Sequence, residues 1–501
     1  MSLVIYDTMS RSKREFVPRE EGKVSMYVCG PTVYNFIHVG NGRAYLVFDV
    51  IRRYLAYKGY EVLYVQNFTD VDDKIINRAN EEGKTPQEVA SFYEKAFLED
   101  MRALNIRPPD IAPRATETIP QMLEMIGTLV DKGSAYVVDG DVYFHVQSFG
   151  EYGKLSGRNL EEMRAGERVE VDERKHHPMD FALWKASKPG EPAWESPWGM
   201  GRPGWHIECS AMSLQHLGMA FDIHGGGQDL VFPHHENEIA QSEAYAGTEP
   251  FVRFWVHNGF VNIREEKMSK SLGNIILVRE ILKRYPADAV RLLALQTHYR
   301  SPIDFGPDAL EEARRAYERI ENCLFALDAF LAKPPSSTAP QRTQKEVELS
   351  DSFFDCERRF EEAMDDDFNT ARAIGIIFEL VKELNTYLDE QERYRTPAAP
   401  MIASHGRDTL LGLCRVLGMF AAEAEKAQER VASSAGEGDP DGLPTAESLI
   451  ELLLEVRSLA RDNKQFETAD FIRSRLRELG VRVDDLREGQ RWKFVGPHEG
   501  S

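Results

Sequence analysis

Two groups of residues in this sequence could act on phosphate. The first follows a short β-prone run and contains His38, Gly40 and Asn41. Glycine lets a ligand approach the backbone closely, histidine can donate a hydrogen bond to a phosphate oxygen, and the N-terminus of the helix predicted to follow favours anions. In isolation, such a loop is more often a glycine-rich turn whose histidine is already hydrogen-bonded.

The second group is a lysine-rich loop, 267–274, with the sequence KMSKSLGN. Lys267 and Lys270 can place two ammonium groups where negative charge develops during phosphoryl transfer. Ser269 and Ser271 flank the second lysine. The simple alternative is a solvated basic loop. Because this loop follows the first group by about 230 residues, the two together indicate nucleotide chemistry more strongly than either does alone.

Four further side chains have the chemistry of a zinc site: Cys29, Cys209, His234 and Glu238. Two thiolates, an imidazole and a carboxylate can form a tetrahedral set of ligands. His234 and Glu238 are four residues apart, so on a helix they would face the same side. For any one of these residues, a purely structural role is the more common case.

The segments that must position these residues alternate between strand-like and helix-like. Residues 24–28 and 61–67 are β-prone, and 42–58 have apolar residues at helical spacing. Strand, helix and strand within about 45 residues indicate a βαβ unit of a parallel sheet. Ligands bind beyond the carboxyl ends of such strands, where the first group lies. We expect further short strands at 254–257 and 261–263.

The second half of the chain is predicted to be mainly helical. Apolar residues recur at spacings of three and four in 309–332 and 371–388. Linkers rich in Pro, Gly and Ser are predicted at 333–343 and 432–444. Beyond them we expect an amphipathic helix at about 445–479, followed by a short strand-like segment and Trp492.

Composition limits the class of protein and its partners. The 501 residues carry a net charge of −21, which argues against nucleic acid unless basic residues are concentrated locally. They are concentrated in residues 457–493, which contain ten basic and seven acidic residues. The five scattered cysteines argue against a disulfide framework and for a reducing compartment. We find no secretory signal and no apolar run of about 18 residues that could span a membrane.

The two groups of residues that could act on phosphate resemble the HIGH and KMSKS signatures of class I aminoacyl-tRNA synthetases. KMSKS is complete, and the first signature is His-Val-Gly-Asn, with Asn41 at the position of the second histidine. An amide at that position can still donate a hydrogen bond. Together with the four zinc-type residues, these motifs resemble the cysteinyl-tRNA synthetases over about residues 20–495. In that family, the positions of Cys29, Cys209, His234 and Glu238 bind zinc.

The resemblance implies a reaction and a set of roles. L-cysteine would be activated by ATP, with Mg²⁺, to cysteinyl-adenylate and then transferred to tRNA(Cys). One zinc ion would select the cysteine thiolate, because a hydroxyl binds zinc poorly. The implied catalytic residues are His38, Asn41, Lys267 and Lys270; the ATP-binding residues are Gly40, Ser269, Lys270 and Ser271; and the substrate-binding residues are Thr69, Trp205, His206 and Asp229.

The resemblance also implies the architecture. We expect an α/β chain with a Rossmann-like parallel-sheet catalytic domain at 1–305, including an inserted subdomain at about 110–200. A stem and an all-α helical bundle would follow at 306–430, then a linker at 431–444 and a small C-terminal anticodon-binding module at 445–501. We further expect a cytoplasmic monomer that binds no membrane.

Two other readings share parts of this pattern. A cysteine:amino-sugar ligase of mycothiol biosynthesis resembles the same catalytic domain, but it has no use for an anticodon module. A non-catalytic tRNA-binding paralogue would not need His38, Lys267, Lys270 and the four zinc-type residues intact. Cysteine-dependent pyrophosphate exchange distinguishes both from a synthetase.

Overall fold

The computed structural model describes residues 2–158, 173–263, 266–267, 276–333 and 342–420. Nearer the C-terminus it describes 450, 453–454, 457–458, 460–461, 466–486 and 489–494. The chain forms two compact units, Met1–Ala421 and Ala422–Ser501. Among the described helices, none combines the length and apolar character that crossing a membrane requires.

A four-stranded parallel sheet forms the centre of the first unit. Its strand order is β10 (Val252–Asn258), β9 (Phe221–Gly227), β3 (Lys23–Val28) and β4 (Glu61–Gln66). Helix α1 (Val39–Tyr57) connects β3 to β4, which confirms the βαβ unit predicted from the sequence. β9 was not predicted, because its sequence FDIHGGG lacks the β-branched and alternating pattern of an ordinary strand.

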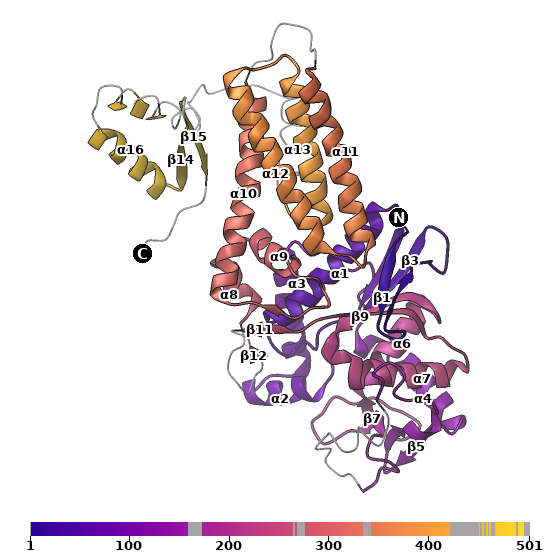
Figure 1. The fold of residues 1–501 in the computed structure, drawn as a ribbon. Coiled ribbons are helices and arrows are strands. Elements are labelled where there is room, and N and C mark those ends of the chain that lie inside the picture. Colours follow the sequence, from indigo (N-terminus) through magenta and orange to yellow (C-terminus); the bar gives the residue numbers. More distant parts are fainter. Residues whose placement is uncertain are drawn as a thin grey trace, which may run out of the picture. The chain divides into compact units, whose positions relative to one another are not determined.

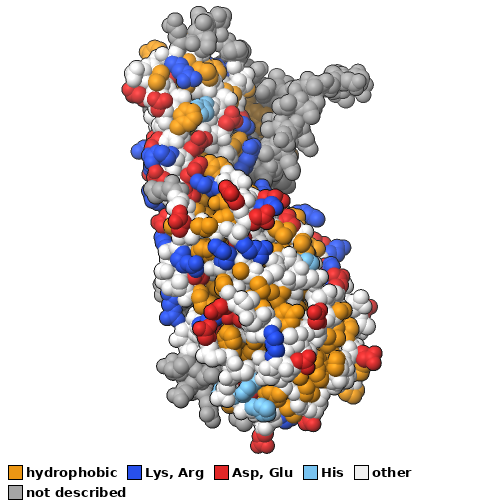
Figure 2. Space-filling view, turned by 90° about the vertical axis from the view of Figure 1, so that its right-hand side faces the viewer, with side chains coloured by type: hydrophobic (Ala, Val, Ile, Leu, Met, Phe, Trp, Pro, Cys, Tyr) orange, Lys and Arg blue, Asp and Glu red, His pale blue; other side chains and the backbone are white. Residues whose placement is uncertain are grey.

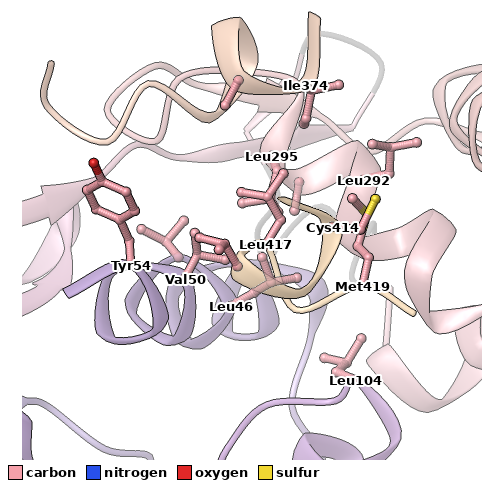
Figure 3. Close-up of a cluster of buried hydrophobic side chains, with 14 of the residues drawn as sticks. Leu46, Val50, Tyr54, Leu104, Leu292, Leu295, Ile374, Cys414, Leu417 and Met419 are labelled. Carbon is pink, nitrogen blue, oxygen red and sulfur yellow. The ribbon is translucent and has the colours of Figure 1, made fainter. Parts of the chain in front are cut away.

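The core lies where α1 meets the helical part of the unit. Leu46 and Val50 of α1 pack in one buried cluster with Leu292 of α9 (Ala287–Leu295) and with Leu417, as Figure 3 shows. Tyr54 reaches the same cluster, and its hydroxyl donates to Asp365 at 2.6 Å. One face of α1 is therefore fixed by apolar packing, while its N-terminal turn is directed to the end of the sheet.

An antiparallel sheet is inserted between β4 and β9. Its order is β5 (Ala135–Val138), β6 (Asp141–Phe144), β7 (Phe181–Ala186) and β8 (Gly201–Pro203). Helix α4 (Ile119–Asp131) packs on this sheet, and Trp184 and Phe144 are buried beneath it. The chain then enters α6 (Trp205–Leu217), which returns it to the central sheet.

The remaining elements of this part surround the sheet. They are the hairpin β1 (Val4–Asp7) and β2 (Ser12–Glu15), α2 (Asp73–Glu82), α3 (Pro86–Ala103), the short turns η1 (Ala115–Glu117), η2 (Val146–Ser148) and η3 (Gln228–Leu230), the π-helical η4 (Val231–His235), α7 (Glu236–Ala246), β11 (Val261–Ile263), β12 (Glu266–Lys267), β13 (Ile303–Asp304) and α8 (Val278–Leu282). The strands predicted at 254–257 and 261–263 are confirmed as parts of β10 and β11.

Four long helices form an elongated bundle at the end of the first unit away from the inserted sheet (Figure 1). They are α10 (Pro307–Leu331), α11 (Gln344–Asp365), α12 (Thr370–Arg393) and α13 (Ala399–Val416). The helices predicted at 309–332 and 371–388 are confirmed by α10 and α12. On the face drawn in Figure 2, Lys and Arg side chains lie among Asp and Glu side chains.

The second unit has a small core of its own. Ile450, Leu454, Leu476, Val481 and Val483 are buried together, with Trp492 packed against them. The elements are α16 (Phe466–Glu478) and an antiparallel pair, β14 (Val481–Leu486) and β15 (Gly489–Phe494). The described residues of the helix predicted at about 445–479 are helical as far as Glu478, and Leu479 is in a turn; the others lie outside the described part of the chain.

Candidate functional site

A cavity of about 420 Å³ opens at the carboxyl ends of β3, β9 and β10. This is the end of a parallel sheet at which ligands bind, and the volume suits a small molecule of nucleotide size. Six residues predicted from the sequence line it: Cys29, His38, Gly40, Asn41, Trp205 and Asp229. We call the part next to Cys29 the cysteine end, and the part next to His38, Asn41 and Gly259 the nucleotide end.

The four zinc-type residues meet at the cysteine end, although they come from different elements. Cys29 follows β3, Cys209 is in α6, His234 is in η4 and Glu238 is in α7. One ligand atom from each lies within 4.8 Å of all the others, and all four side chains are buried. The fold thus brings together two cysteines that are 180 positions apart in the sequence.

The spacing of these atoms fits a tetrahedral metal. Zn–S bonds of about 2.3 Å place two sulfur ligands about 3.8 Å apart. The Sγ atoms of Cys29 and Cys209 are 3.8 Å apart, and Cys29 Sγ lies 3.7 Å from Glu238 Oε1. The Nε2 atom of His234 is buried 3.0 Å from Glu238 Oε1, yet it makes no well-directed hydrogen bond to a described residue. A ring nitrogen of His234 thus lies close to both sulfurs and to the carboxylate oxygen, as a fourth metal ligand would.

The charges at this site suit a cation. The hydrogen bond from the Cys29 thiol lowers the pKa of Cys209 to about 6, although burial opposes the shift. Burial raises the pKa of Glu238, but His224 and His234 outweigh it and bring the pKa to about 2. Burial lowers the pKa of His234, and Glu238 with Cys209 raises it to about 10. A thiolate and a carboxylate are therefore present at neutral pH as metal donors.

A second set of possible ligands shares two members with the first: Cys29, His224, His235 and Glu238. Here the histidines already have hydrogen-bond partners. His224 Nε2 contacts Glu238 Oε2 at 2.9 Å, and His235 Nε2 contacts Cys29 Sγ at 3.4 Å. His224 and His235 are therefore placed to orient Glu238 and Cys29. Residues that hydrogen-bond to metal ligands commonly do this.

A line of buried hydrogen bonds continues outward from His235. His235 Nδ1 contacts His257 Nε2 at 2.7 Å, and His257 Nδ1 contacts the Thr8 hydroxyl at 2.8 Å. Burial lowers the pKa of His257 to about 3, so this ring is neutral. Sequence reasoning assigned no role to His224, His235 or His257. The doubled histidine at 234–235 was the available signal.

Trp205 and His206 reach the site from the first turn of α6. The Trp205 ring stacks on the His234 ring with centroids 4.1 Å apart, and His206 Nδ1 lies 3.0 Å from His234 Nδ1. His206 lines an adjoining groove. Among the described residues, it is not part of the wall of the main cavity. Asp229 lies on the wall of the main cavity.

Thr69 was expected to contact the substrate, but its side chain does not face the cavity. Its side chain is 1% exposed, and its hydroxyl donates to Glu208 Oε2 at 2.8 Å. Burial raises the pKa of Glu208 well above its ordinary value. Among the described residues, Thr69 is not on the cavity wall. Asn67, two residues earlier, was missed: its Oδ1 accepts from Gly30 N at 2.8 Å and lies 3.8 Å from Cys209 Sγ.

At the nucleotide end, His38 and Asn41 cap α1 together. His38 Nδ1 accepts from Asn41 N at 3.2 Å, and Asn41 Oδ1 accepts from His38 N at 3.3 Å. This capping box fixes both side chains at the N-terminus of the helix. The helix dipole and the small side of Gly40 favour an anion at this helix N-terminus.

The lysine-rich loop cannot be placed against this site. Lys267 belongs to β12, but its side chain lies outside the described part of the chain, as do residues 268–275. The roles expected of Lys270, Ser269 and Ser271 therefore rest on the sequence. Lys74 lines both the main cavity and the adjoining groove.

Comparison with family models gives two matches. Residues 15–315 match the catalytic domain of class I (C) tRNA synthetases, and residues 359–421 match the DALR domain. Curated relatives match nearly the whole chain. A cysteine–tRNA ligase of Pelotomaculum thermopropionicum is 54% identical over 98% of this chain and 100% of its own. One of Heliobacterium modesticaldum is 50% identical over the same shares.

Solved structures extend the similarity at the level of the fold. Methionyl-tRNA synthetase of Mycobacterium tuberculosis, in complex with methionyl-adenylate, superposes with a TM-score of 0.59 at 17% identity. The match covers 79% of this chain and 89% of that one. LeuRS of Agrobacterium radiobacter, in a ternary complex with tRNA and LeuAMS, has a TM-score of 0.59 at 13% identity over 83% and 86% of the two chains.

Proposed function

This chain belongs to the cysteine–tRNA ligases among the class I aminoacyl-tRNA synthetases, and from that premise we propose that Cys29, Cys209, His234 and Glu238 hold a zinc ion that selects cysteine. The chain is a ligase that activates cysteine with ATP and transfers it to tRNA. The observation that carries the zinc proposal is the convergence of two sulfurs, a nitrogen and a carboxylate oxygen at one buried point.

Zinc at that point would supply a soft Lewis acid for the substrate thiolate, which the hydroxyl of serine cannot match. The residues around it do the rest. Trp205 covers the His234 ring, so that the ligand keeps one orientation, and His224 holds Glu238 through a hydrogen bond of 2.9 Å. A site that discriminates through a strong polar bond needs no separate editing step.

Asp229 is the group we propose for the substrate ammonium. It is a carboxylate on the wall of the cavity, so it could pair with the amino group of a bound cysteine. We assign His206 a positioning role through His234, because their Nδ1 atoms are 3.0 Å apart. Thr69 stays a proposal as a substrate contact, and its bond to Glu208 would have to turn for that contact to form.

At the nucleotide end, we propose that His38, Asn41 and Gly40 bind the phosphates of ATP, with Mg²⁺ and with Ser269, Lys270 and Ser271. The cysteine carboxylate attacks the α-phosphorus, and pyrophosphate leaves. Negative charge then builds on the phosphate oxygens, where the helix N-terminus, Lys267 and Lys270 stabilise it. Positioning and charge account for the acceleration, so no covalent enzyme intermediate is needed.

The adjoining groove is where we propose that the end of tRNA(Cys) enters. It measures about 380 Å³ and shares Lys74 and Trp205 with the main cavity. Its other charged lining residues are Lys175 and Lys185, together with Asp72, Asp73 and Asp180. Lysines suit the phosphates of an incoming strand. The terminal ribose hydroxyl would thereby reach the adenylate.

We retain the remaining expectations as proposals. The catalytic domain would span 1–305 with its insertion at 110–200, the bundle 306–430, the linker 431–444, and the anticodon-binding module 445–501. In that module Arg473 and Arg475 are exposed on α16, which suits contact with RNA. A monomer acting in the cytoplasm agrees with five free, buried cysteines, which a reducing compartment maintains.

Metal analysis and amino-acid-dependent pyrophosphate exchange test the zinc proposal together. Purified enzyme should contain about one zinc per chain. Removing the metal with a chelator should abolish cysteine-dependent exchange, and restoring zinc should recover it. Serine should support little exchange in either state. Full exchange by zinc-free enzyme would show that another feature selects cysteine.

A further inference from the structure

Arg43 is a buried guanidinium in α1 that the reaction described above does not use. Its side chain is 1% exposed. Nη1 donates to the carbonyl oxygens of Gly259 and Phe260, both at 2.9 Å. Nη2 donates to the carbonyl oxygens of Tyr299 at 3.3 Å and Ser301 at 2.7 Å. One side chain thus connects three segments that are far apart in the sequence.

The charge of Arg43 has no matching carboxylate among the described residues. Burial lowers its pKa to about 10, so the guanidinium remains charged at neutral pH. Its Nε has no hydrogen-bond partner within the described part of the chain. Burying such a charge against carbonyl oxygens alone is costly, and a hydrophobic side chain would serve packing better. The fork of donors therefore has a use other than packing.

The backbone that Arg43 holds is part of the cavity. Gly259 and Phe260 follow β10 and line the nucleotide end, and His38, Gly40 and Asn41 of the α1 turn line the same cavity. Arg43 is two residues beyond Asn41 in α1. The guanidinium therefore links the phosphate-binding turn to another part of the cavity wall.

The third segment fixes that part of the wall from behind. Gly259 N donates to Tyr299 O at 2.8 Å. A Cβ on Gly259 would lie 2.6 Å from the carbonyl oxygen of Arg300, so the two backbones touch. The 299–301 segment is itself held by Asp367 at the end of α11, which accepts from the Tyr299 hydroxyl and from Arg300 Nε, both at 2.7 Å.

We propose that Arg43 is a positioning residue for the nucleotide: its fork sets the spacing between the first turn of α1 and the Gly259–Phe260 loop. That spacing is the width of the nucleotide end. The inference rests on the proposed function in one respect, namely that ATP binds at this end. Cysteine binding should be independent of the fork, because its four hydrogen bonds go to the 259–260 and 299–301 segments and none goes to a zinc-type residue.

Arg291 offers a matched control. It is also fully buried, it donates to the carbonyl oxygens of Leu417 and Leu104 at 3.0 and 2.9 Å, and it lies in α9. Unlike Arg43, it pairs with a carboxylate, Asp49, at 2.7 Å. It is not among the residues that line the cavity. Its replacement should cost stability without affecting the nucleotide.

The test is cysteine-dependent pyrophosphate exchange by full-length Arg43→Met, Arg43→Lys and Arg291→Lys, with zinc bound. Arg43→Met should raise the KM for ATP roughly 10- to 100-fold, since a displacement of about 1 Å costs this much. The KM for cysteine should change less than about twofold. Arg43→Lys keeps the charge but not the fork. It should recover only part of the ATP effect.

Melting temperatures separate positioning from general damage. Arg291→Lys should lower the melting temperature and leave both KM values near those of the wild type. If Arg43→Lys matches that behaviour, or if both KM values of the Arg43 variants rise equally, Arg43 is structural and the proposal is wrong. If Arg43→Met does not fold, Arg43→Lys, compared through equilibrium binding of ATP alone, decides the question. A wild-type enzyme without cysteine-dependent exchange would instead contradict the proposed function.

Discussion

At the cysteine end of the cavity the four ligand-type side chains are between 0% and 8% exposed, and each has a partner that holds it. At the nucleotide end, Gly40 and the Gly259–Phe260 loop line the cavity, and His38 and Asn41 cap the N-terminus of α1. One end thus depends on which atoms its side chains carry. The other depends on where its backbone lies.

This difference agrees with the ligand that we propose for each end. A thiol differs from a hydroxyl in one atom, so only a bond of the right chemistry can separate the two substrates. ATP presents several charged oxygens, and backbone N–H groups at a helix N-terminus suit these regardless of side chain. Substitutions at the two ends should therefore have separable effects on cysteine and ATP.

The largest effect is expected from Cys209→Ser, which exchanges a soft ligand for a hard one. Loss of a partner in the layer around a metal site costs about 10- to 100-fold, and loss of a ligand should cost at least about 100-fold in kcat/KM for cysteine. Zinc content, measured by atomic absorption, should fall as well.

Cys323→Ser is the control for that variant. Cys323 is equally buried, but it lies in the bundle on α10, remote from the ligands. It should retain zinc and the wild-type KM for cysteine. If Cys209→Ser kept a normal zinc content, the cysteine end would not depend on the chemistry of this side chain, and the contrast between the two ends would be wrong.

Gly259→Ala should disturb the opposite end. A Cβ there would lie 2.6 Å from two backbone carbonyl oxygens, so the loop has to move. We expect the KM for ATP to rise about tenfold or more while the KM for cysteine is unchanged. Gly375→Ala is a suitable control, because a Cβ at that position of α12 meets nothing within 4 Å. Equal changes in both KM values would show that the ends are not independent.

Sequence reasoning identified the four ligand-type residues, which the fold brings together, more easily than the residues that hydrogen-bond to them. Cys29, Cys209, His234 and Glu238 carry unusual chemistry, and the βαβ pattern placed Cys29 at the end of a strand. His224 escaped notice because it lies in β9, whose glycine-rich sequence does not look like a strand. Gly226 is needed there because a Cβ would lie 2.8 Å from the His235 ring.

Thr69 shows a different limit. Its place just after a strand can be read from the sequence, but its bond to Glu208 cannot, because Glu208 comes from α6, far away in sequence. Arg43 was overlooked for a similar reason. Its partners are backbone carbonyl oxygens, which every residue has, so no residue type in the sequence marks them.

Asn41→Ala tests whether side chains matter at the nucleotide end through the helix cap. Losing the bond from His38 N to Asn41 Oδ1 should lower the free energy of unfolding by about 0.5–1.5 kcal/mol. Asn41→Asp keeps an acceptor and should retain most of that stability. Urea unfolding of the two variants provides the measurement. Equal stability of Asn41→Ala and the wild type would mean that backbone alone defines this helix terminus.

The smallest effect concerns acid. Burial raises the pKa of Asp49, but Arg291 and Arg53 outweigh it, so the pKa is lowered. Its contribution is therefore complete above the ordinary carboxyl value and is lost as the pH falls below about 4. The wild type should lose stability more steeply than Asp49→Asn between about pH 4 and pH 3. Parallel loss in both would show that the support beneath α1 does not depend on this charge.

The distance along the chain between Cys29 and Cys209 has a consequence for synthesis on the ribosome. They are 180 positions apart, the segment between them includes the whole antiparallel sheet β5–β8, and the last of the proposed ligands, Glu238, is translated later still. A nascent chain therefore cannot capture zinc at this site until the inserted sheet has been made and α7 has begun to form. Once captured, the ion would act as a cross-link that closes a very long loop, and long loops gain the most from closure. Zinc uptake would then report that both halves of the central sheet have come together, which makes it a natural last checkpoint in the assembly of this enzyme.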